Sequence, residues 1–269
     1  MSSLVIIGIC AHNEEKDLAQ TVADIREAMS RTEYTYGVLI QNDGSTDRTH
    51  EIGRRCADFV YAEGERAGLA RTFKANMRNC LMHGADIVVH TDGDGQYPAE
   101  KIPELIRQIE AGYDLAIGSR FLGGDRYANG VHKRFGNKIF SAVMSLVCGR
   151  RVTDVTSGFR AMSRATAELI DIQSQFTYTY DQYVQASWSG LRIAEIPIAG
   201  SPTRTSRLMK SFMHYTTRAL RDIAVNWKTW RVNARILRTR RAAARALGSI
   251  PSPLVSDRQT AKIGKAGVV

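Results

Sequence analysis

Cysteines and long apolar runs are scarce in this sequence. The 269 residues include four cysteines, none in a C-x-x-C spacing: Cys10, Cys56, Cys80 and Cys148. This spacing argues against the common zinc and redox motifs and predicts reduced, mostly buried thiols in a cytoplasmic protein. The most apolar helical stretch, residues 139–148, is far shorter than the roughly 18 residues that a membrane span needs. The N-terminus has no basic leader region, so we expect neither a signal peptide nor a bilayer-spanning helix.

Two common phosphate-binding loops are also absent. No G-x-G-x-x-G follows the first predicted strand, and no G-x-x-x-x-G-K-[ST] occurs in the chain. Both absences argue against dinucleotide-binding and P-loop enzymes. Positive charge, in contrast, is in excess: 37 Lys and Arg against 27 Asp and Glu give a net charge of +10. Such a charge predicts an anionic partner, which is a phosphorylated substrate, a membrane surface or a nucleic acid.

Predicted strands and helices alternate along the first 120 residues. A continuous apolar run at residues 4–10 is typical of a strand covered on both faces. The other strands are expected at residues 36–40, 58–61, 86–91 and 114–118. Between them, Asn13 is expected to cap the first helix and Pro98 to occupy the first position of a later one. The alternation predicts an α/β fold with a doubly wound, mostly parallel sheet.

Polar segments follow four of these predicted strands. They are residues 11–15, 42–47, 92–94 and 118–120. Each alone is typical of a turn with a helix cap. Because ligands of such sheets bind at the carboxyl ends of the strands, the four together predict a ligand site at one edge.

Asp92 and Asp94 are the most informative of these residues. They stand one residue apart at the end of an expected strand, so both side chains point the same way and can converge. Two carboxylates there suit Mg²⁺ or Mn²⁺, especially when a diphosphate supplies the other ligands. A D-x-D pair alone is more often a solvated turn, but its position at the end of a strand favours a metal site.

In order and spacing, these segments resemble the family 2 inverting glycosyltransferases of the GT-A fold. The matching segments are Asn13-Glu14-Glu15, Asn42 to Asp47, and Asp92-Gly93-Asp94-Gly95-Gln96. Three later segments, 118–121, 134–137 and 154–160, resemble the dolichol-phosphate mannose synthase and polyprenyl-phosphate glycosyltransferase branch. The resemblance covers roughly residues 4–210 and implies a Rossmann-like GT-A catalytic domain over residues 1–205.

The resemblance also implies roles for individual residues. The nucleotide-sugar donor would contact Ala11, Asn13, Glu14, Asp43, Asp92 and Arg207, with Asp43 at the nucleobase and Arg207 over the diphosphate. The metal, Mg²⁺ or Mn²⁺, would be held by Asp92, Asp94 and Gln96. Arg120 and Arg134 resemble arginines that bind an acceptor phosphate, a task that suits the guanidinium fork. Asp94 and both arginines would act in catalysis together with Asp181, which stands near an acidic residue typical of the family.

Some residues have structural interpretations or depart from the family pattern. Arg120 could be a surface arginine, and Asp154 is expected to cap a helix or to pair with Arg160. Gly158 stands where some lipid-phosphate transferases carry an aspartate, and Tyr97 replaces the more usual histidine. There is no Gln-x-x-Arg-Trp, so the processive polysaccharide synthases match poorly.

A basic amphipathic helical segment is predicted at residues 206–247. Between residues 204 and 245 there are twelve Lys or Arg and one acid, Asp222. An apolar series runs through it at steps of three and four: Leu208, Phe212, Tyr215, Ala219, Ile223, Trp227, Trp230, Ala234 and Leu237. Such a helix could lie on an anionic membrane, or it could pack on the catalytic domain or on a second subunit. Residues 248–269 are predicted to be a disordered tail.

The sequence therefore predicts metal-dependent, inverting transfer of one sugar from a UDP- or GDP-linked donor to a phosphate-bearing acceptor. The leading acceptor is a polyprenyl phosphate at the cytoplasmic membrane face, which is already anionic and needs no strong base. One alternative is a soluble acceptor such as a natural-product intermediate, with Asp181 or Asp154 as base. The other is a non-catalytic nucleic-acid-binding protein, against which the acidic motifs argue.

Overall fold

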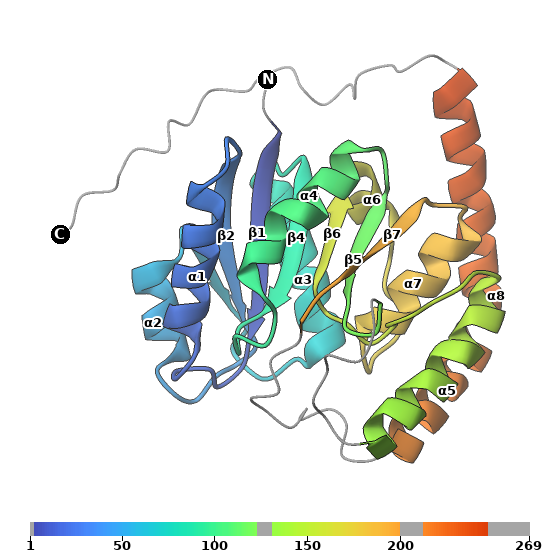
Figure 1. The fold of residues 1–269 in the computed structure, drawn as a ribbon, viewed down its shortest axis with the longest axis horizontal. Coiled ribbons are helices and arrows are strands. Elements are labelled where there is room, and N and C mark those ends of the chain that lie inside the picture. Colours follow the sequence, from blue (N-terminus) through green and yellow to red (C-terminus); the bar gives the residue numbers. More distant parts are fainter. Residues whose placement is uncertain (1–2, 123–130, 200–211, 247–269) are drawn as a thin grey trace.

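The computed structural model describes residues 3–122, 131–199 and 212–246. Its centre is a seven-stranded sheet in the order β3-β2-β1-β4-β6-β5-β7 (Figure 1). The strands are β1 (Leu4–Ala11), β2 (Thr35–Asn42), β3 (Phe59–Ala62), β4 (Ile87–Asp92), β5 (Leu115–Ser119), β6 (Arg160–Ser163) and β7 (Ile193–Pro197). Paired strands are parallel except that β6 runs antiparallel to β4 and β5. The predicted α/β fold with a mostly parallel sheet is confirmed.

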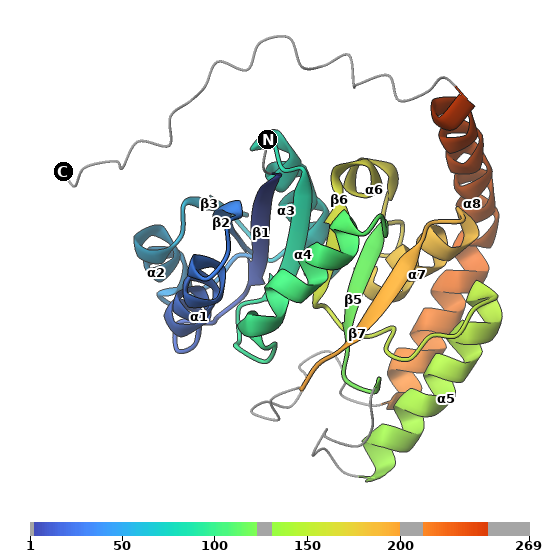
Figure 2. The ribbon, with the colours of Figure 1, turned by 45° about the horizontal axis from the view of Figure 1, so that its top comes forward.

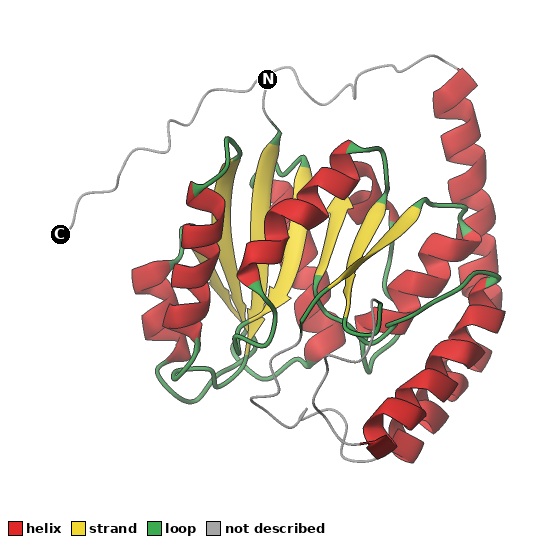
Figure 3. Ribbon diagram, viewed as in Figure 1, coloured by secondary structure: helices red, strands yellow, loops and turns green. Residues whose placement is uncertain are grey.

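Helices cover both faces of the sheet (Figures 1 and 3). They are α1 (Leu18–Ser30), α2 (Thr49–Cys56), α3 (Leu69–Met82), the 3₁₀ helix η1 (Ala99–Lys101), α4 (Ile102–Glu110), α5 (Val131–Cys148), α6 (Arg164–Leu169), α7 (Tyr178–Trp188) and α8 (Phe212–Ala246). One apolar core joins α1 and α4 to the sheet, and the other joins it to α3, α5, α7 and α8. Successive residues of β1 feed the two cores in turn, because side chains alternate along a strand: Val5 and Ile7 enter the first, Ile6 the second.

Two predicted helix starts are wrong. Helix α1 begins at Leu18 with Asp17 before it, so Asn13 is not its cap. Asn13 instead has a left-handed backbone, with φ of 55°, and its Oδ1 accepts a hydrogen bond from the Thr46 backbone N–H at 2.9 Å. Pro98 lies before η1 and has an extended backbone. At Asn13, the polar residues after β1 tie two loops together at the sheet edge before the helix begins.

The predicted C-terminal helix is confirmed as α8, and its apolar series packs on the catalytic domain. Ala219, Ile223, Trp230 and Ala234 are buried. The Trp188 ring of α7 contacts the Trp227 ring edge-on, with 4.5 Å between centroids. Asp222 accepts hydrogen bonds from Tyr180 Oη at 2.5 Å and Ser174 Oγ at 2.7 Å.

Of the alternatives left open for this apolar series, packing on the catalytic domain holds for Trp227 and Trp230, and a membrane contact through these two rings is wrong because they face the protein. Trp230 is completely buried and Trp227 packs against the same core. The other members of the apolar series, from Leu208 to Tyr215 and at Leu237, lie outside the described side chains, as does the predicted tail. Among the described helices, none has the length and apolar character needed to span a bilayer.

Candidate active site

The loops that follow β1, β2 and β4 meet at one edge of the sheet. Ala11 is in register with Asn42 on β2, and Cys10 is in register with Asp92 on β4. Ser119, at the end of β5, lies at the same edge beside the end of β7. This is the lower edge of the sheet in Figures 1 and 2, and the first residues of α5 extend past it. The structure thus brings the four polar segments together as predicted.

The loops after β1 and β2 are hydrogen-bonded to each other. The Asn13 N–H donates to Ser45 Oγ at 3.0 Å, and the Glu14 N–H donates to Thr49 Oγ1 at 2.7 Å. The Asp43 N–H donates to the Ala11 carbonyl at 2.9 Å. These bonds fix the backbone positions of Ala11, Asn13 and Glu14, the residues predicted to line the donor pocket.

Asp43 has a structural partner at this edge. Its Oδ1 accepts hydrogen bonds from the backbone N–H groups of Ala67 at 2.7 Å and Gly68 at 3.1 Å. Gly68 directly precedes helix α3, so the carboxylate lies at the positive end of that helix. Asp43 is buried, with 6% of its surface exposed. Asp43 therefore holds the backbone of Ala67 and Gly68 in place. Its contact with a nucleobase stays a prediction.

Asp92 and Asp94 concentrate negative charge at the centre of the edge. Burial, followed by the nearby Asp94 and Glu14 carboxylates, raises the pKa of Asp92 to about 7, although Arg120 opposes the shift. Asp94 Oδ1 accepts a hydrogen bond from the Gln96 backbone N–H at 3.2 Å. The Asp92 side chain is 35% exposed. A cation bound here would relieve the repulsion that raises this pKa.

The two carboxylates are suitable oxygen ligands for Mg²⁺ or Mn²⁺, but they are too few to complete its coordination. Within the described residues no group of three or more His, Cys, Asp or Glu could hold a metal by itself. Two carboxylates leave most of an octahedral shell to other oxygen ligands, as expected for a metal bound together with phosphate groups. If a metal binds here, the two carboxylates would supply only part of its ligands, with Gln96 as the third predicted ligand.

The side chains of Tyr97, Tyr178 and Asp92 converge on Gly158, and of these the sequence did not single out Tyr178. The backbone N–H of Gly158 donates to Tyr97 Oη at 2.7 Å. A Cβ atom at this position would lie 2.8 Å from Tyr178 Oη and 3.2 Å from Asp92 Oδ2. The absence of an aspartate at this position thus has a steric reason, since even a methyl group would be crowded. Tyr97, which replaces the more usual histidine, uses its hydroxyl to hold this segment against the Asp92 carboxylate.

Arg120 and Asp154 form a buried ion pair. Arg120 Nε and Nη2 donate to the two oxygens of Asp154 at 2.7 and 2.9 Å, and Nη2 also donates to Thr156 Oγ1 at 2.8 Å. Asp154 is fully buried, and Arg120 is 16% exposed. The pKa of Asp154 is lowered overall. Burial, the largest single influence, raises this pKa, but the charge and hydrogen bonds of Arg120, together with Thr156, outweigh burial. The interpretation of Arg120 as a surface arginine is therefore wrong.

The predicted pairing of Asp154 with Arg160 is also wrong. Arg160 is completely buried, and its guanidinium donates to the carbonyls of Ser157 and Val155 at 2.9 Å and to Gln182 Oε1 at 2.8 Å. Asp154 is instead taken by Arg120, because the end of β5 brings that arginine beside it. The prediction relied on the short distance in sequence between residues 154 and 160. The actual partner, Arg120, follows strand β5 and is distant in the chain.

Asp181 is buried in the first turn of α7 and is fully engaged. Its Oδ2 accepts from the backbone N–H groups of Gln173 at 2.6 Å and Ser174 at 2.7 Å, and its Oδ1 accepts from Gln185 Nε2 at 2.5 Å. Burial raises the pKa of Asp181 to about 6, and these hydrogen bonds oppose the shift. Its evident role is to hold the segment before α7. The remaining predicted site residues, Arg134 and Arg207, lie outside the described side chains.

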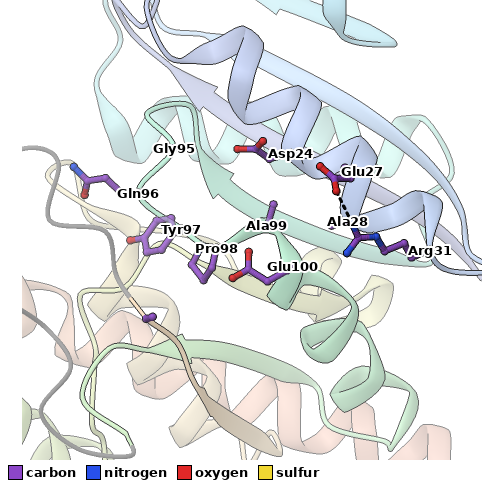
Figure 4. A pocket seen from close by; sticks show the side chains of 11 residues that line it. Asp24, Glu27, Ala28, Arg31, Gly95, Gln96, Tyr97, Pro98, Ala99 and Glu100 are labelled. Carbon is purple, nitrogen blue, oxygen red and sulfur yellow. Dashed lines mark hydrogen bonds and ion pairs between the residues drawn. The ribbon is translucent and has the colours of Figure 1, made fainter.

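A hollow lies on the outer side of the segment after Asp94. It has a volume of ≈ 360 Å³ between α1 and residues 95–100 (Figure 4). Asp24, Glu27 and Glu100 line it, and Glu27 pairs with Arg31. Neither Asp92 nor Asp94 reaches it, and Gln96 is turned away from Asp24 in the figure. The hollow therefore adjoins the sheet-edge site, since Gln96 and Tyr97 also line it.

A family model described as glycosyl transferase family 2 matches residues 6–170. The chain belongs to this family. As a family 2 glycosyltransferase the protein is an enzyme, which sets aside the alternative of a non-catalytic nucleic-acid-binding protein. The match spans the loops after β1, β2, β4 and β5, so it covers the whole sheet edge described above.

Several curated relatives are similar over most of their length. The chain is 32% identical over 195 residues to the dolichyl-phosphate hexose transferase of Haloferax volcanii, covering 72% of this chain and 80% of the relative. It is 30% identical over 207 residues to the undecaprenyl-phosphate mannosyltransferase of Micrococcus luteus, with 72% and 82% coverage. It is 28% identical to the polyprenol monophosphomannose synthase of Mycolicibacterium smegmatis, with 73% and 76% coverage.

Solved structures confirm the GT-A fold. A glucosyl-3-phosphoglycerate synthase from Mycobacterium tuberculosis, crystallised with Mn²⁺, UDP and glucosyl-3-phosphoglycerate, aligns with a TM-score of 0.61 at 16% identity, over 82% of this chain and 80% of that one. The mannosyl-3-phosphoglycerate synthase of Rubrobacter xylanophilus aligns with a TM-score of 0.62 at 12% identity, over 94% and 79%. At these identities the likeness establishes the fold alone.

Proposed function

We propose that this glycosyltransferase moves one sugar, with inversion and with the help of a divalent cation, from a nucleotide-sugar donor to a polyprenyl phosphate. The observation that carries the proposal is the Asp92–Asp94 pair at the carboxyl end of β4, where burial and the neighbouring negative charge raise the pKa of Asp92 to about 7. Relatives named as polyprenyl- and dolichyl-phosphate sugar transferases support the acceptor.

The donor would lie across the ends of β1, β2 and β4. We assign the nucleoside to Ala11, Asn13, Glu14 and Asp43, and the metal to Asp92, Asp94 and Gln96. A UDP- or GDP-linked sugar fits this assignment. Bound Mg²⁺ or Mn²⁺ would neutralise the diphosphate of the leaving group. Arg207 would add positive charge over the same diphosphate.

The acceptor is inferred to be anionic because the two candidate bases have other tasks. Asp154 is fully buried and bound on both oxygens by Arg120. Asp181 is fully buried and accepts two backbone N–H groups and the Gln185 amide. A hydroxyl acceptor would need a base within hydrogen-bond reach, whereas a phosphate oxygen is already a nucleophile at neutral pH.

Arg120 and Arg134 are assigned to the acceptor phosphate. Arg120 is held in one orientation by Asp154 and Thr156, so it would meet an anion with little loss of side-chain freedom. Arg134 stands in the first turn of α5, which extends past the same sheet edge. Together they would form a cationic entrance opposite the metal.

A soluble phosphorylated acceptor is the second candidate. It is favoured by the structural neighbour crystallised with UDP-glucose and phosphoglyceric acid, whose fold this chain shares. Both candidates present a phosphate, so Arg120 and Arg134 would serve either one. Natural-product acceptors without a phosphate rank lower, because they would need Asp154 or Asp181 as a base.

A peripheral membrane position fits the outer face of α8. Val225, Val232 and Ile236 are exposed there, and Lys228 and Arg235 are exposed on the same helix. On a helix, residues 225, 232 and 236 share one side, away from the side that Ala219, Ile223 and Trp230 bury. Apolar side chains flanked by cations suit an anionic lipid surface. We therefore assign the proposed membrane contact to this outer face of α8 and no longer to the side that carries the tryptophans.

Sugar transfer by the purified protein tests the proposal. Radiolabelled UDP- and GDP-sugars would be offered with a polyprenyl phosphate in detergent micelles or with 3-phosphoglycerate, in Mn²⁺, in Mg²⁺ and in excess EDTA. We expect label in the lipid phase with metal and none with EDTA. Label in the aqueous phosphoglycerate would favour the soluble acceptor. Full turnover in EDTA would refute the metal assignment.

A further inference from the structure

A buried histidine lies directly behind the metal-binding aspartate. His90 precedes Asp92 by two residues on β4, so both side chains project from the same face of the strand. His90 is completely buried, and its Nε2 lies 3.9 Å from Asp92 Oδ1. This nitrogen makes no hydrogen bond within the geometric limits to any residue that the structure describes. Leaving a buried polar atom without a hydrogen bond costs free energy. This cost suggests that Nε2 gains a hydrogen-bond partner when ligands are bound.

Asn76 sets the tautomer of this imidazole. Asn76 Nδ2 lies 3.0 Å from His90 Nδ1, and the Cys80 thiol donates to Asn76 Oδ1 at 3.7 Å. With its oxygen facing the thiol, the amide presents an N–H to the ring, so Nδ1 must accept. In a neutral imidazole the proton then sits on Nε2, the nitrogen that faces Asp92.

Two aromatic rings hold the imidazole in place. Phe73 of α3 and Tyr178 of α7 both meet it edge-on, with centroids at 4.9 and 5.1 Å, and they stack on each other at 3.7 Å. The ring therefore has little freedom to turn, whereas Asp92, 35% exposed, can adjust. Hydrogen bonds of active sites are often long in the free enzyme and shorten in the complex.

We propose that His90 is a positioning residue for Asp92, which donates its Nε2–H to the Asp92 carboxylate when a divalent cation and nucleotide are bound. The inference rests on the metal assignment in the proposed function. This hydrogen bond from Nε2–H would occupy one Asp92 oxygen, leave the other oxygen for the metal, and fix the direction in which that other oxygen points. A hydrogen bond to a ligating carboxylate is the usual outer-shell support of a metal site.

The tautomer is tested without metal or substrate. Long-range ¹H–¹⁵N spectra of the full chain labelled with ¹⁵N-histidine report which ring nitrogen carries the proton, and His90→Asn identifies the His90 signals. We expect a neutral ring with the proton on Nε2 from pH 6 to 8. A proton on Nδ1 would overturn the proposal, because Nε2 could then only accept.

A matched pair of variants tests the function of this donor. In His90→Gln the amide nitrogen can reach the place of Nε2, whereas in His90→Asn the shorter amide reaches only the place of Nδ1. We expect His90→Asn to weaken Mn²⁺ binding in the presence of UDP by about tenfold, measured by calorimetry or electron paramagnetic resonance. His90→Gln should keep most of the affinity, and UDP affinity without metal should be unchanged in both.

The outcomes separate four situations. Equal Mn²⁺ affinity in wild type and both variants would overturn the proposal and leave His90 with a purely structural place in the core. Equal weakening in both variants would also overturn it, because Gln should rescue the donor. If the wild type itself binds no Mn²⁺, the metal assignment fails and the positioning role falls with it, whatever the tautomer. If neither variant folds, the wild-type tautomer decides, with the His90 signals assigned from sequential backbone spectra of the wild type itself.

Discussion

At the scale of single residues, the surroundings of Asp92 should influence both stability and the proposed metal binding. Burial and two other carboxylates raise its pKa, and Arg120 compensates only in part. The free enzyme therefore keeps unfavourable electrostatic energy at the place where a cation is proposed to bind. Stability and metal binding should consequently respond in opposite directions when a carboxylate is removed.

Asp94→Asn should keep the fold and lose metal-dependent activity. The substitution preserves shape but removes one anionic ligand, so Mn²⁺ affinity should fall by at least about 100-fold, more than an outer-shell change produces. Thermal denaturation checks the fold, and calorimetry with Mn²⁺ and UDP checks the affinity. Turnover at the wild-type rate would remove Asp94 from the metal site.

The stability of the metal-free enzyme should decrease as the pH rises from 5 to 8. An aspartate titrates near 3.9 in the unfolded chain and, for Asp92, at about 7 in the folded one. The folded state thus binds the proton more tightly, and this stabilisation, full below the unfolded value, is lost as the pH passes the folded value. Because the side chain is 35% exposed, solvent screening limits the effect to about 1 kcal/mol, or roughly 2–4 °C.

Thermal melts in EDTA at a series of pH values, compared between wild type and Asp92→Asn, isolate this contribution. The variant should lose that part of the slope, while Asp181, whose pKa is raised to about 6, contributes equally to both proteins. Parallel curves for the two proteins would show that Asp92 titrates normally.

Arg120→Lys should impair both stability and transfer. Lysine keeps the charge but cannot hold both Asp154 oxygens and Thr156 at once, so we expect a loss of about 1–3 kcal/mol at this buried pair. Arg134→Lys, at the start of α5, is the matched comparison and should reduce transfer to the acceptor while donor binding is kept. Equal stability loss in both variants, measured by urea unfolding, would contradict this difference.

At the scale of secondary-structure elements, close packing between the β4 and β6 segments shapes the site. Gly158→Ala should destabilise the protein by about 1–3 kcal/mol, because the added methyl would crowd Tyr178 Oη and Asp92 Oδ2. It should also weaken Mn²⁺ binding, since Asp92 would have to move. Gly64→Ala is the control, because no atom lies within 4 Å of its added Cβ, and its melting temperature should change little. Similar melts for both variants would argue against the crowding.

The apolar side of α8 is an element of the core and should behave like one. Trp230→Ala should cost about 3–5 kcal/mol, as for other large buried side chains. Val225→Ala on the outer face, where the side chain is 71% exposed, should stay within about 0.5 kcal/mol. Chemical denaturation compares the two. A small loss in Trp230→Ala would mean that α8 is only loosely attached to the catalytic domain.

At the scale of the whole molecule, the net charge of +10 should bring the enzyme to anionic membranes. Each cation near such a surface contributes about 1 kcal/mol, and the attraction weakens as salt screens it. Lys228→Glu/Arg235→Glu on α8 should therefore reduce co-sedimentation with anionic vesicles more than Arg54→Glu/Arg55→Glu on α2, although net charge changes equally. Equal loss in both variants would indicate general electrostatic attraction without a membrane-binding face.

The sequence by itself determined the alternation of strands and helices, the sheet edge that carries the polar loops, the Asp92–Asp94 pair and the existence of α8. These features depend on local patterns: apolar periodicity, the two-residue repeat of a strand, and the rule that parallel strands present their carboxyl ends together. All of them follow from a few residues that are near one another in the chain.

Only the tertiary structure decided which side chains are partners. Arg120 meets Asp154 and Asn76 meets His90 across different elements, and Asp181 serves the loop before α7. The tryptophans of α8 likewise turn toward Trp188 and away from solvent. A helical stripe fixes which residues share a side, but the surface that covers it depends on how distant elements pack, because burial and electrostatic pairing are properties of positions in space.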